Sequence, residues 1–149
     1  MREDAAVREA RAEDLQQLLE LYLHLHETAV PPRDATLENT WNAILKDENH
    51  HVIVCEKAGN IVSSCVCVVV PNLTRGVRPY ALIENVVTHP AYRGKGLATR
   101  CLQFARETAE RENCYKIMLL TGAKDEKTLE FYRRAGFNSS DKTAFILWL

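Results

Sequence analysis

The stretch Tyr80–Glu112 restricts the possible folds more than any other part of the sequence. It opens with a nearly continuous apolar run, Tyr80–Thr88, which ends at His89-Pro90 and predicts a strand buried on both faces. After a short segment with two glycines, small and apolar residues recur at the i, i+3, i+4, i+7 spacing of an amphipathic helix. A buried strand, a glycine loop and a helix in this order predict an α/β fold.

The remaining periodic segments complete this α/β plan. Gly59-Asn60 lies between two strand-like runs, so we expect these runs to pair as an antiparallel hairpin. Pro31-Pro32 separates two amphipathic helices, because proline lacks the backbone donor that a helix needs. The expected strands are Ala5–Ala10, His51–Lys57, Ile61–Val70, Tyr80–Thr88, Tyr115–Thr121 and Thr143–Leu149. The expected helices are Asp14–His26, Leu37–Leu45, Ala98–Glu112 and Glu126–Ala135.

Length and composition are those of an ordinary globular chain. The 149 residues suit a single domain spanning 1–149, with 46% hydrophobic and 26% charged residues. The formal net charge of −1 argues against a general nucleic-acid or anionic-membrane binder. The longest apolar stretch, Cys65–Pro71, is far shorter than the ~20 residues of a membrane helix, and the charged start Arg2-Glu3-Asp4 does not resemble a signal peptide. We therefore expect a cytoplasmic protein that binds neither nucleic acid nor membrane.

The cysteines and histidines do not predict a metal site. There are five cysteines, an odd number without a C-x-x-C pair, which predicts neither a disulfide framework nor a zinc site. His24 and His26 are two positions apart on an expected helix, so they point to different sides and are poor joint ligands. We expect no metal and a reducing compartment.

The segment between the buried strand and its helix is the best candidate for a binding site. Glycines let the backbone approach a ligand, and the first N–H groups of a helix have no partner within it. Together with the helix dipole and the charges of Arg93 and Lys95, these groups predict a site for phosphate or pyrophosphate. The segment is not a P-loop, since Gly96 follows Lys95, and it is not a Rossmann fingerprint, since Thr99 replaces the third glycine. An ordinary glycine loop before a helix is the alternative.

Two motifs resemble those of one enzyme family. Arg93, Gly96 and Ala98 match the acetyl-CoA signature of the GNAT N-acetyltransferase superfamily, which reads Gln or Arg, two residues, Gly, one residue, and Gly or Ala. The run Phe131–Phe137 resembles the F-Y-x-x-x-G-F sequence near the C-terminus of that family. The resemblance covers nearly the whole chain. It implies the GNAT fold, with a mixed central sheet of about six to seven strands and helices on both faces.

The resemblance also implies how acetyl-CoA would bind. The strand Leu82–Val87 would separate from the Tyr115–Thr121 strand, and the pantetheine arm would pair with backbone groups near Val86 and Val87 in the gap. In the family, a bulge there aims one backbone N–H at the thioester carbonyl, and Val87 is the best candidate for that donor. The residues implied in cofactor binding are Val86, Val87, Arg93, Gly94, Lys95, Gly96, Leu97, Ala98, Thr99, Asp125 and Thr128.

Two residues match the positions of family acid–base groups. An alkyl amine with a pKa near ~10.4 is only about one part in a thousand neutral at pH 7, so a base helps, and Glu84 matches the family's carboxylate. The departing thiolate needs a proton, which Tyr132 would donate. The structural alternatives are an ion pair for Glu84 and aromatic packing for Tyr132.

The resemblance implies transfer of an acetyl group to a primary amine of a small molecule by direct attack. Two alternatives stay open: a catalytically inactive CoA-binding regulatory module, and an acetyltransferase acting on a protein or peptide amine. A nucleotide-phosphate transferase is less well supported, because the lysine–Ser/Thr pair is missing.

Other segments bear on substrate and assembly. Glu84–Val87 and Lys142–Leu149 loosely resemble glucosamine-6-phosphate acetyltransferases, in which case Arg75 and Arg78 would meet a phosphate. The apolar end Phe145–Leu149 predicts a homodimer, because an open hydrophobic edge strand is an aggregation hazard.

Overall fold

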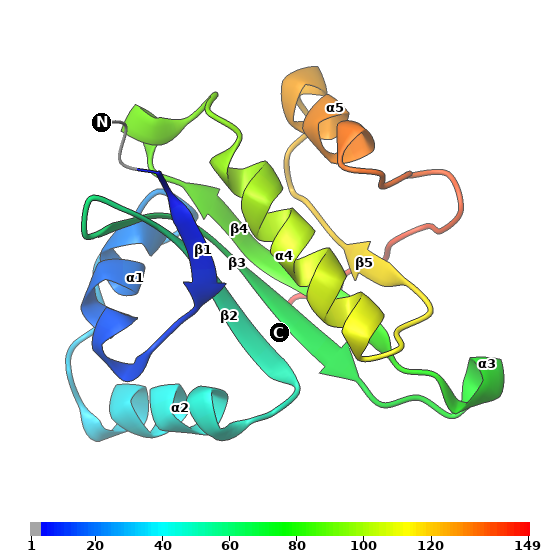
Figure 1. Cartoon of the computed structure of the whole chain (residues 1–149), viewed down its shortest axis with the longest axis horizontal. Coiled ribbons are helices and arrows are strands. Elements are labelled where there is room, and N and C mark those ends of the chain that lie inside the picture. The colour runs from blue at the N-terminus through cyan, green and yellow to red at the C-terminus, as the bar shows by residue number, and fades with distance from the viewer. Residues whose placement is uncertain (1–3) are drawn as a thin grey trace. The chain divides into compact units, whose positions relative to one another are not determined.

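Figure 1 shows the computed structural model, which describes residues 4–149. The chain divides into two compact units, Met1–Leu119 and Leu120–Leu149, so a single domain over 1–149 remains a prediction. The first unit holds a five-stranded sheet in the order β1-β2-β3-β4-β5, in which only the β4–β5 pair is parallel. The strands are β1 (Ala6–Glu9), β2 (His50–Lys57), β3 (Asn60–Val70), β4 (Tyr80–Thr88) and β5 (Ile117–Leu119).

Four α-helices connect these strands, and the fifth, α5, lies in the second unit. The α-helices are α1 (Leu15–Tyr22), α2 (Ala35–Lys46), α3 (Thr74–Val77), α4 (Leu97–Arg111) and α5 (Glu126–Arg134). Two short 3-10 turns, η1 (Ala12–Asp14) and η2 (Pro90–Tyr92), precede α1 and α4. The predicted α/β fold is confirmed. Within residues 4–149, no helix combines the length and the apolar character that a membrane span requires.

The expected number of strands was too high, and the C-terminal strand accounts for part of the difference. The sheet has five strands rather than six to seven, and no strand forms over 143–149. Phe145 and Trp148 in this segment are 91% and 84% exposed. A strand is stable only where a neighbour bonds its backbone and covers its side chains, which local hydrophobicity cannot supply.

Helices cover both faces of the sheet in the first unit, as expected. Along β2, Val52 and Val54 belong to the apolar cluster with α1 and α2, whereas Ile53 and Cys55 are fully buried on the opposite face. Helix α4 packs across that opposite face (Figure 1). The cluster on the α1 side contains Leu15, Leu18, Leu21, Trp41, Val52, Val54, Ile61, Val66 and Val87.

Helix α1 is fixed to the sheet by polar contacts at its start. The buried carboxylate of Asp14 accepts hydrogen bonds from Arg8 Nη1 at 2.6 Å and from the Arg11 backbone N–H at 2.7 Å. The bond from Arg8 holds the pKa of Asp14 below its usual value. One turn further on, the Gln17 side chain accepts from the Ile61 backbone N–H at 2.9 Å. The position of α1 over the sheet is therefore set by backbone and side-chain bonds as well as by apolar packing.

Candidate active site

Strands β4 and β5 pair over only part of their length. The parallel register joins Ala81 to Ile117, Leu82 to Met118 and Ile83 to Leu119, where β5 ends. Strand β4 continues to Thr88, so within the described chain its last five residues, 84–88, have a strand partner on the β3 side only. The backbone groups on the other side of this segment are available to an extended ligand.

A β-bulge lies in the part of β4 that has no partner on the β5 side. Val66 of β3 pairs with Glu84 and Ser64 pairs with Val87, so Cys65 alone opposes two residues, Asn85 and Val86. Asn85 has a φ of 53°, which is the left-handed conformation. In a regular strand, Glu84 and Val87 would face opposite sides of the sheet. The extra residue brings both to the side of α1.

The side chains around the bulge differ in exposure. Glu84 is exposed, and no ion pair or hydrogen bond joins its side chain to another residue of the described chain. The alternative of a structural ion pair for Glu84 thus finds no partner there. Val87 is only 4% exposed, and Val86 is half-buried. Val87 fixes the strand in the core while Glu84 extends into solvent.

The start of α4 has the geometry of an anion site. Gly94 and Gly96 have φ values of 75° and 77°, in the left-handed region where a side chain would be strained. The first helical bond runs from the Arg100 N–H to the Gly96 carbonyl at 3.1 Å, and no side chain caps the helix. The N–H groups of residues 97–99 therefore lack a partner within the helix. A Cβ built at either glycine meets nothing within 4 Å, so space is open for a ligand.

The two basic residues of this loop make contacts within the chain. Arg93 donates from Nε to the Thr88 carbonyl at 3.2 Å, which joins the loop to the end of β4. Lys95 places its ammonium 5.3 Å from the centre of the Tyr92 ring. His89 accepts a hydrogen bond at Nδ1 from the Ala91 N–H and so caps the η2 turn. The positive charges of Arg93 and Lys95 lie beside the helix start, where the N–H groups of residues 97–99 have no acceptor within the helix.

In the second unit, the two residues expected to contact the cofactor are bonded to each other. Asp125 caps α5, accepting from the Thr128 N–H at 2.9 Å and from its hydroxyl at 2.7 Å. The hydrogen bonds from Thr128 lower the pKa of Asp125. Tyr132 lies on α5, with its ring 5.1 Å from the Phe131 ring and 6.3 Å from the Phe137 ring. Its aromatic packing is thus observed, and its acid role remains a prediction.

Arg75 and Arg78, the two candidates for binding a phosphate of the substrate, make contacts within the chain. Arg78 donates from Nε to the Asn113 carbonyl and from Nη2 to the Cys114 carbonyl. Arg75 lies 5.5 Å from the centre of the Tyr115 ring. Arg78 therefore joins the loop before β4 to the turn before β5, which is a structural role.

The cysteine side chains do not form a nucleophile or a metal site in the described chain. All five thiols are free, and four are buried. Burial raises the pKa of Cys67 and Cys101 to about 12, so these thiols stay protonated at neutral pH. Among residues 4–149, no cluster of three or more His, Cys, Asp or Glu side chains suits a metal ion.

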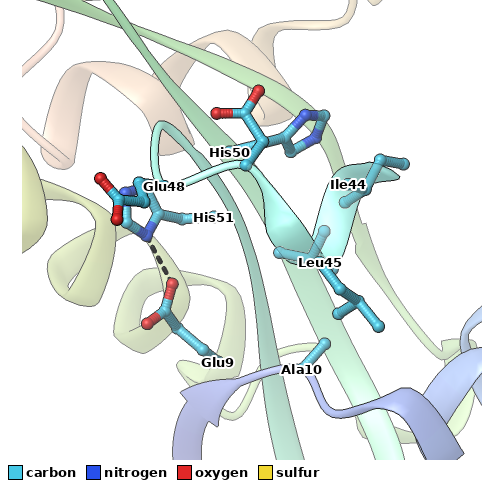
Figure 2. Close-up of a pocket in the computed structure, with 9 residues that line it drawn as sticks. Glu9, Ala10, Ile44, Leu45, Glu48, His50 and His51 are labelled. Atoms are coloured by element: carbon cyan, nitrogen blue, oxygen red, sulfur yellow. Dashed lines mark hydrogen bonds and ion pairs between the residues drawn. The ribbon is translucent and has the colours of Figure 1, made fainter. Parts of the chain in front are cut away.

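A separate hollow of about 330 Å³ lies between the end of α2 and the start of β2. Figure 2 shows it, with the ion pair between His51 Nδ1 and Glu9 Oε1 at its edge. The hollow lies at the end of the sheet where β4 begins. His50 of β2 pairs with Val68 of β3, and Val68 pairs with Leu82, which is in the first half of β4. The bulge and the α4 start lie at the other end of the strand, so this hollow is not the candidate active site.

The residue that sequence analysis missed is Asn85. The sequence motifs assign no role to it, whereas the structure makes it the left-handed residue of the bulge. The usable signal was an asparagine inside a β-rich run, because asparagine adopts the left-handed conformation more readily than other non-glycine residues.

A bulged strand with one side open, followed by an uncapped helix N-terminus, is an arrangement that suits an extended ligand with an anionic end. The sequence pattern of the acetyltransferase (GNAT) family matches residues 14–137. The chain belongs to this family and is an N-acetyltransferase. The family uses acetyl-CoA.

Individual relatives agree with this assignment. A glucosamine 6-phosphate N-acetyltransferase of Trypanosoma brucei brucei is 33% identical over 140 residues, which are 93% of this chain and 92% of that protein. The solved structure of a provisionally assigned acetyltransferase of Agrobacterium tumefaciens C58 has 39% identity and a TM-score of 0.90, covering 97% of this chain and 99% of that one. A transcriptional regulator of Bacillus halodurans C-125 has 27% identity and a TM-score of 0.87, covering 97% and 100%.

Proposed function

We propose that this enzyme transfers the acetyl group of acetyl-CoA to a primary amine of a small molecule by direct attack. The observation that carries the proposal is the combination, in one compact unit, of a bulged and half-unpaired β4 with the uncapped N-terminus of α4. An extended ligand with an anionic end fits these two features together. The pantetheine arm of CoA is such an extended chain, and its pyrophosphate is the anion.

Each part of the cofactor has residues that would hold it. Backbone N–H groups from Arg93 to Thr99 would bind the pyrophosphate, since Gly94 and Gly96 leave open space beside them. Backbone groups of Val86 and Val87 would pair with the pantetheine arm, and the Val87 N–H would donate to the thioester carbonyl. The resemblance to the family also implies that Asp125 and Thr128 contact the cofactor.

The chemistry needs one base and one acid. Acetyl-CoA supplies an acetyl group activated as a thioester. The amine nitrogen forms a bond to the acetyl carbon while the carbon–sulfur bond breaks. Glu84 would take the proton that the amine loses, directly or through water, and Tyr132 would give a proton to the sulfur. The products are an amide and the free thiol of CoA, so protons and electrons balance.

The acceptor proposed for the first test is an amino sugar phosphate. The support is the 33% identity with a glucosamine 6-phosphate N-acetyltransferase over nearly both full lengths. A protein or peptide amine is a second acceptor class. A regulatory module without catalysis is favoured by one observation, the 27% identity with a transcriptional regulator. The five free cysteines support a reducing, cytoplasmic location.

Calorimetric titration with acetyl-CoA tests the proposal, with ATP–magnesium as the comparison ligand. We expect micromolar binding of acetyl-CoA and none of ATP–magnesium. A screen of glucosamine 6-phosphate, polyamines and peptide N-termini for thiol release then assigns the acceptor. Binding of ATP–magnesium without binding of acetyl-CoA would support the phosphate-transferase alternative instead.

The Tyr132→Phe variant separates an enzyme from a regulatory module. We expect kcat to fall roughly 100-fold, because the leaving thiolate loses its proton donor, with acetyl-CoA affinity unchanged. The phenylalanine ring keeps the packing against Phe131 and Phe137, so folding is preserved. The measurement is steady-state thiol release with the acceptor found in the screen. Equal kcat in both proteins would remove Tyr132 from the acid role.

We also propose a homodimer in which the C-terminal segment 143–149 is covered by a second copy. The segment presents consecutive apolar side chains, of which Phe145 and Leu147 are 91% and 83% exposed. An isolated chain rarely leaves such a run in water. We expect a mass near twice 16.9 kDa by light scattering at micromolar concentration, and a monomer for the Phe145→Glu, Leu147→Glu double variant. A monomeric parent chain would contradict the proposal.

A further inference from the structure

Two adjacent serines interrupt the apolar run of β3 beside the bulge in β4. Ser63 and Ser64 are both fully buried, and a buried hydroxyl is costly unless it is hydrogen-bonded. Ser64 donates from Oγ to the Ile53 carbonyl in β2 at 2.7 Å. Ser63 bonds in the other direction, towards β4.

The side chain of Ser63 joins the two residues that follow the bulge. Its Oγ donates to the Val87 carbonyl at 3.1 Å and lies 2.8 Å from the Thr88 Oγ1. Because a hydroxyl carries a single proton, the Thr88 hydroxyl is the donor in the second bond. The result is a chain of two hydroxyl groups that ends on the backbone of Val87.

Thr88 also connects the bulge to the loop before α4. Its carbonyl accepts from Arg93 Nε at 3.2 Å. The next residue, His89, donates its N–H to the Val62 carbonyl in β3 at 2.8 Å. Thr88 is therefore bonded to β3 through its hydroxyl and to the first residue of the anion site through its carbonyl.

The bond between the two hydroxyls depends on the register of β4. The pairs are Val66–Glu84 before the bulge and Ser63–Thr88 after it. Without the extra residue, the pairing that starts at Val66–Glu84 would place Val87 opposite Ser63. Neighbouring residues of a strand face opposite sides of the sheet, so the Thr88 hydroxyl would then point away from Ser63. The bond forms only when the bulge is present.

We propose that Ser63 is a positioning residue: with Thr88 it holds β4 in the bulged register, and so holds the backbone groups of Val86 and Val87 in place for the thioester of acetyl-CoA. This inference rests on the proposed function, in which those backbone groups meet the thioester and the pantetheine arm. Ser63 is fully buried in β3, so it acts through β4 and not by touching the substrate.

The Ser63→Ala variant removes both bonds of this hydroxyl. We expect kcat to fall roughly tenfold, because a small misplacement of the reacting atoms is costly. KM for acetyl-CoA is expected to change less than about threefold, since the Thr88 carbonyl still accepts from Arg93. In the ligand-free protein, we expect the NMR amide signals of Val86 and Val87 to broaden or double, because the register without the bulge becomes populated.

Ser64→Ala is the matched control. It removes an equally buried hydroxyl from the next residue of the same strand, but the lost bond goes to β2. Both variants should lower the thermal midpoint, because each leaves a buried carbonyl with one donor fewer. Only Ser63→Ala should lower kcat and alter the two amide signals. Equal kcat in the two variants would show a merely structural role and overturn the proposal.

Variants of Thr88 test the hydroxyl chain itself. Thr88→Val removes the donor to Ser63 with little change of shape and is expected to match Ser63→Ala, whereas Thr88→Ser keeps the hydroxyl and is expected to match the parent chain. The Ser63→Ala, Thr88→Val double variant should be no worse than either single variant. Losses that multiply would show that the two hydroxyls act independently, which contradicts the proposal. Thr88 is only half-buried, so Thr88→Val gives this test even if Ser63→Ala fails to fold.

The outcomes separate this inference from the proposed function. A parent chain that binds no acetyl-CoA would overturn the proposed function. The amide signals of the ligand-free Ser63→Ala and Thr88→Val variants would still report whether the two hydroxyls hold the bulge. Unchanged signals in both variants would overturn the positioning role of Ser63, whichever cofactor the chain binds.

Discussion

Replacement of Gly96 by glutamate is expected to abolish acetyl-CoA binding. Gly96 is the N-cap of α4 with a φ of 77°, so any side chain is strained there. The open space beside it would receive a carboxylate, next to the N–H groups that we assign to the pyrophosphate. Charge repulsion and competition for the same donors act together, and we expect affinity to fall at least about 100-fold. The measurement is calorimetric titration of both proteins with acetyl-CoA.

Gly59→Glu is the matched control for this variant. Gly59 has nearly the same φ, 78°, and equally open surroundings, but it lies in the turn between β2 and β3. The two substitutions therefore impose similar backbone strain and the same added charge. Gly59→Glu is expected to bind acetyl-CoA like the parent chain. If both variants lose binding equally, the loss reflects destabilisation, and α4 is not the pyrophosphate site.

The Glu84→Gln variant is expected to lose about 100-fold in kcat at pH 7. Glutamine has the same shape but does not accept the proton of an ammonium group. The deficit should shrink as the pH rises, because the neutral fraction of an amine with a pKa near ~10.4 increases about tenfold per pH unit below that value. Affinity for acetyl-CoA should not change, since the anion site lies beyond the end of β4. Rate measurements from pH 7 to pH 9.5 test this expectation.

Glu107→Gln provides the comparison for Glu84. Its carboxylate lies on the exposed side of α4, where it accepts a hydrogen bond from Gln103. This variant makes the same chemical change outside the proposed site, and its pH–rate profile should follow that of the parent. A Glu84→Gln deficit that is constant with pH would show that Glu84 orients the substrate and that another group, or water, takes the proton.

The anion site shows how far local sequence information reaches. Glycines before a helix, an apolar repeat at helical spacing and a strand ending in His-Pro are all properties of consecutive residues, and the strand and the helix form where they were predicted. An anion site could be predicted at this helix start without knowledge of the rest of the chain, because the first N–H groups of a helix have no partner within it.

The C-terminal segment shows the opposite case. Its apolar run predicts a strand from composition alone, yet no strand forms over 143–149. Strand formation depends on a neighbouring backbone that sequence patterns do not identify. The same dependence explains why β5 spans only Ile117–Leu119, although the apolar run extends over Tyr115–Thr121.

The sequence by itself determined the α/β class, the helix start that suits an anion, and the likeness to one enzyme family, because these follow from local spacing and short motifs. Only the tertiary structure decided which backbone groups of β4 are free and where its bulge lies. Both depend on the register with β3 and on the point where β5 ends.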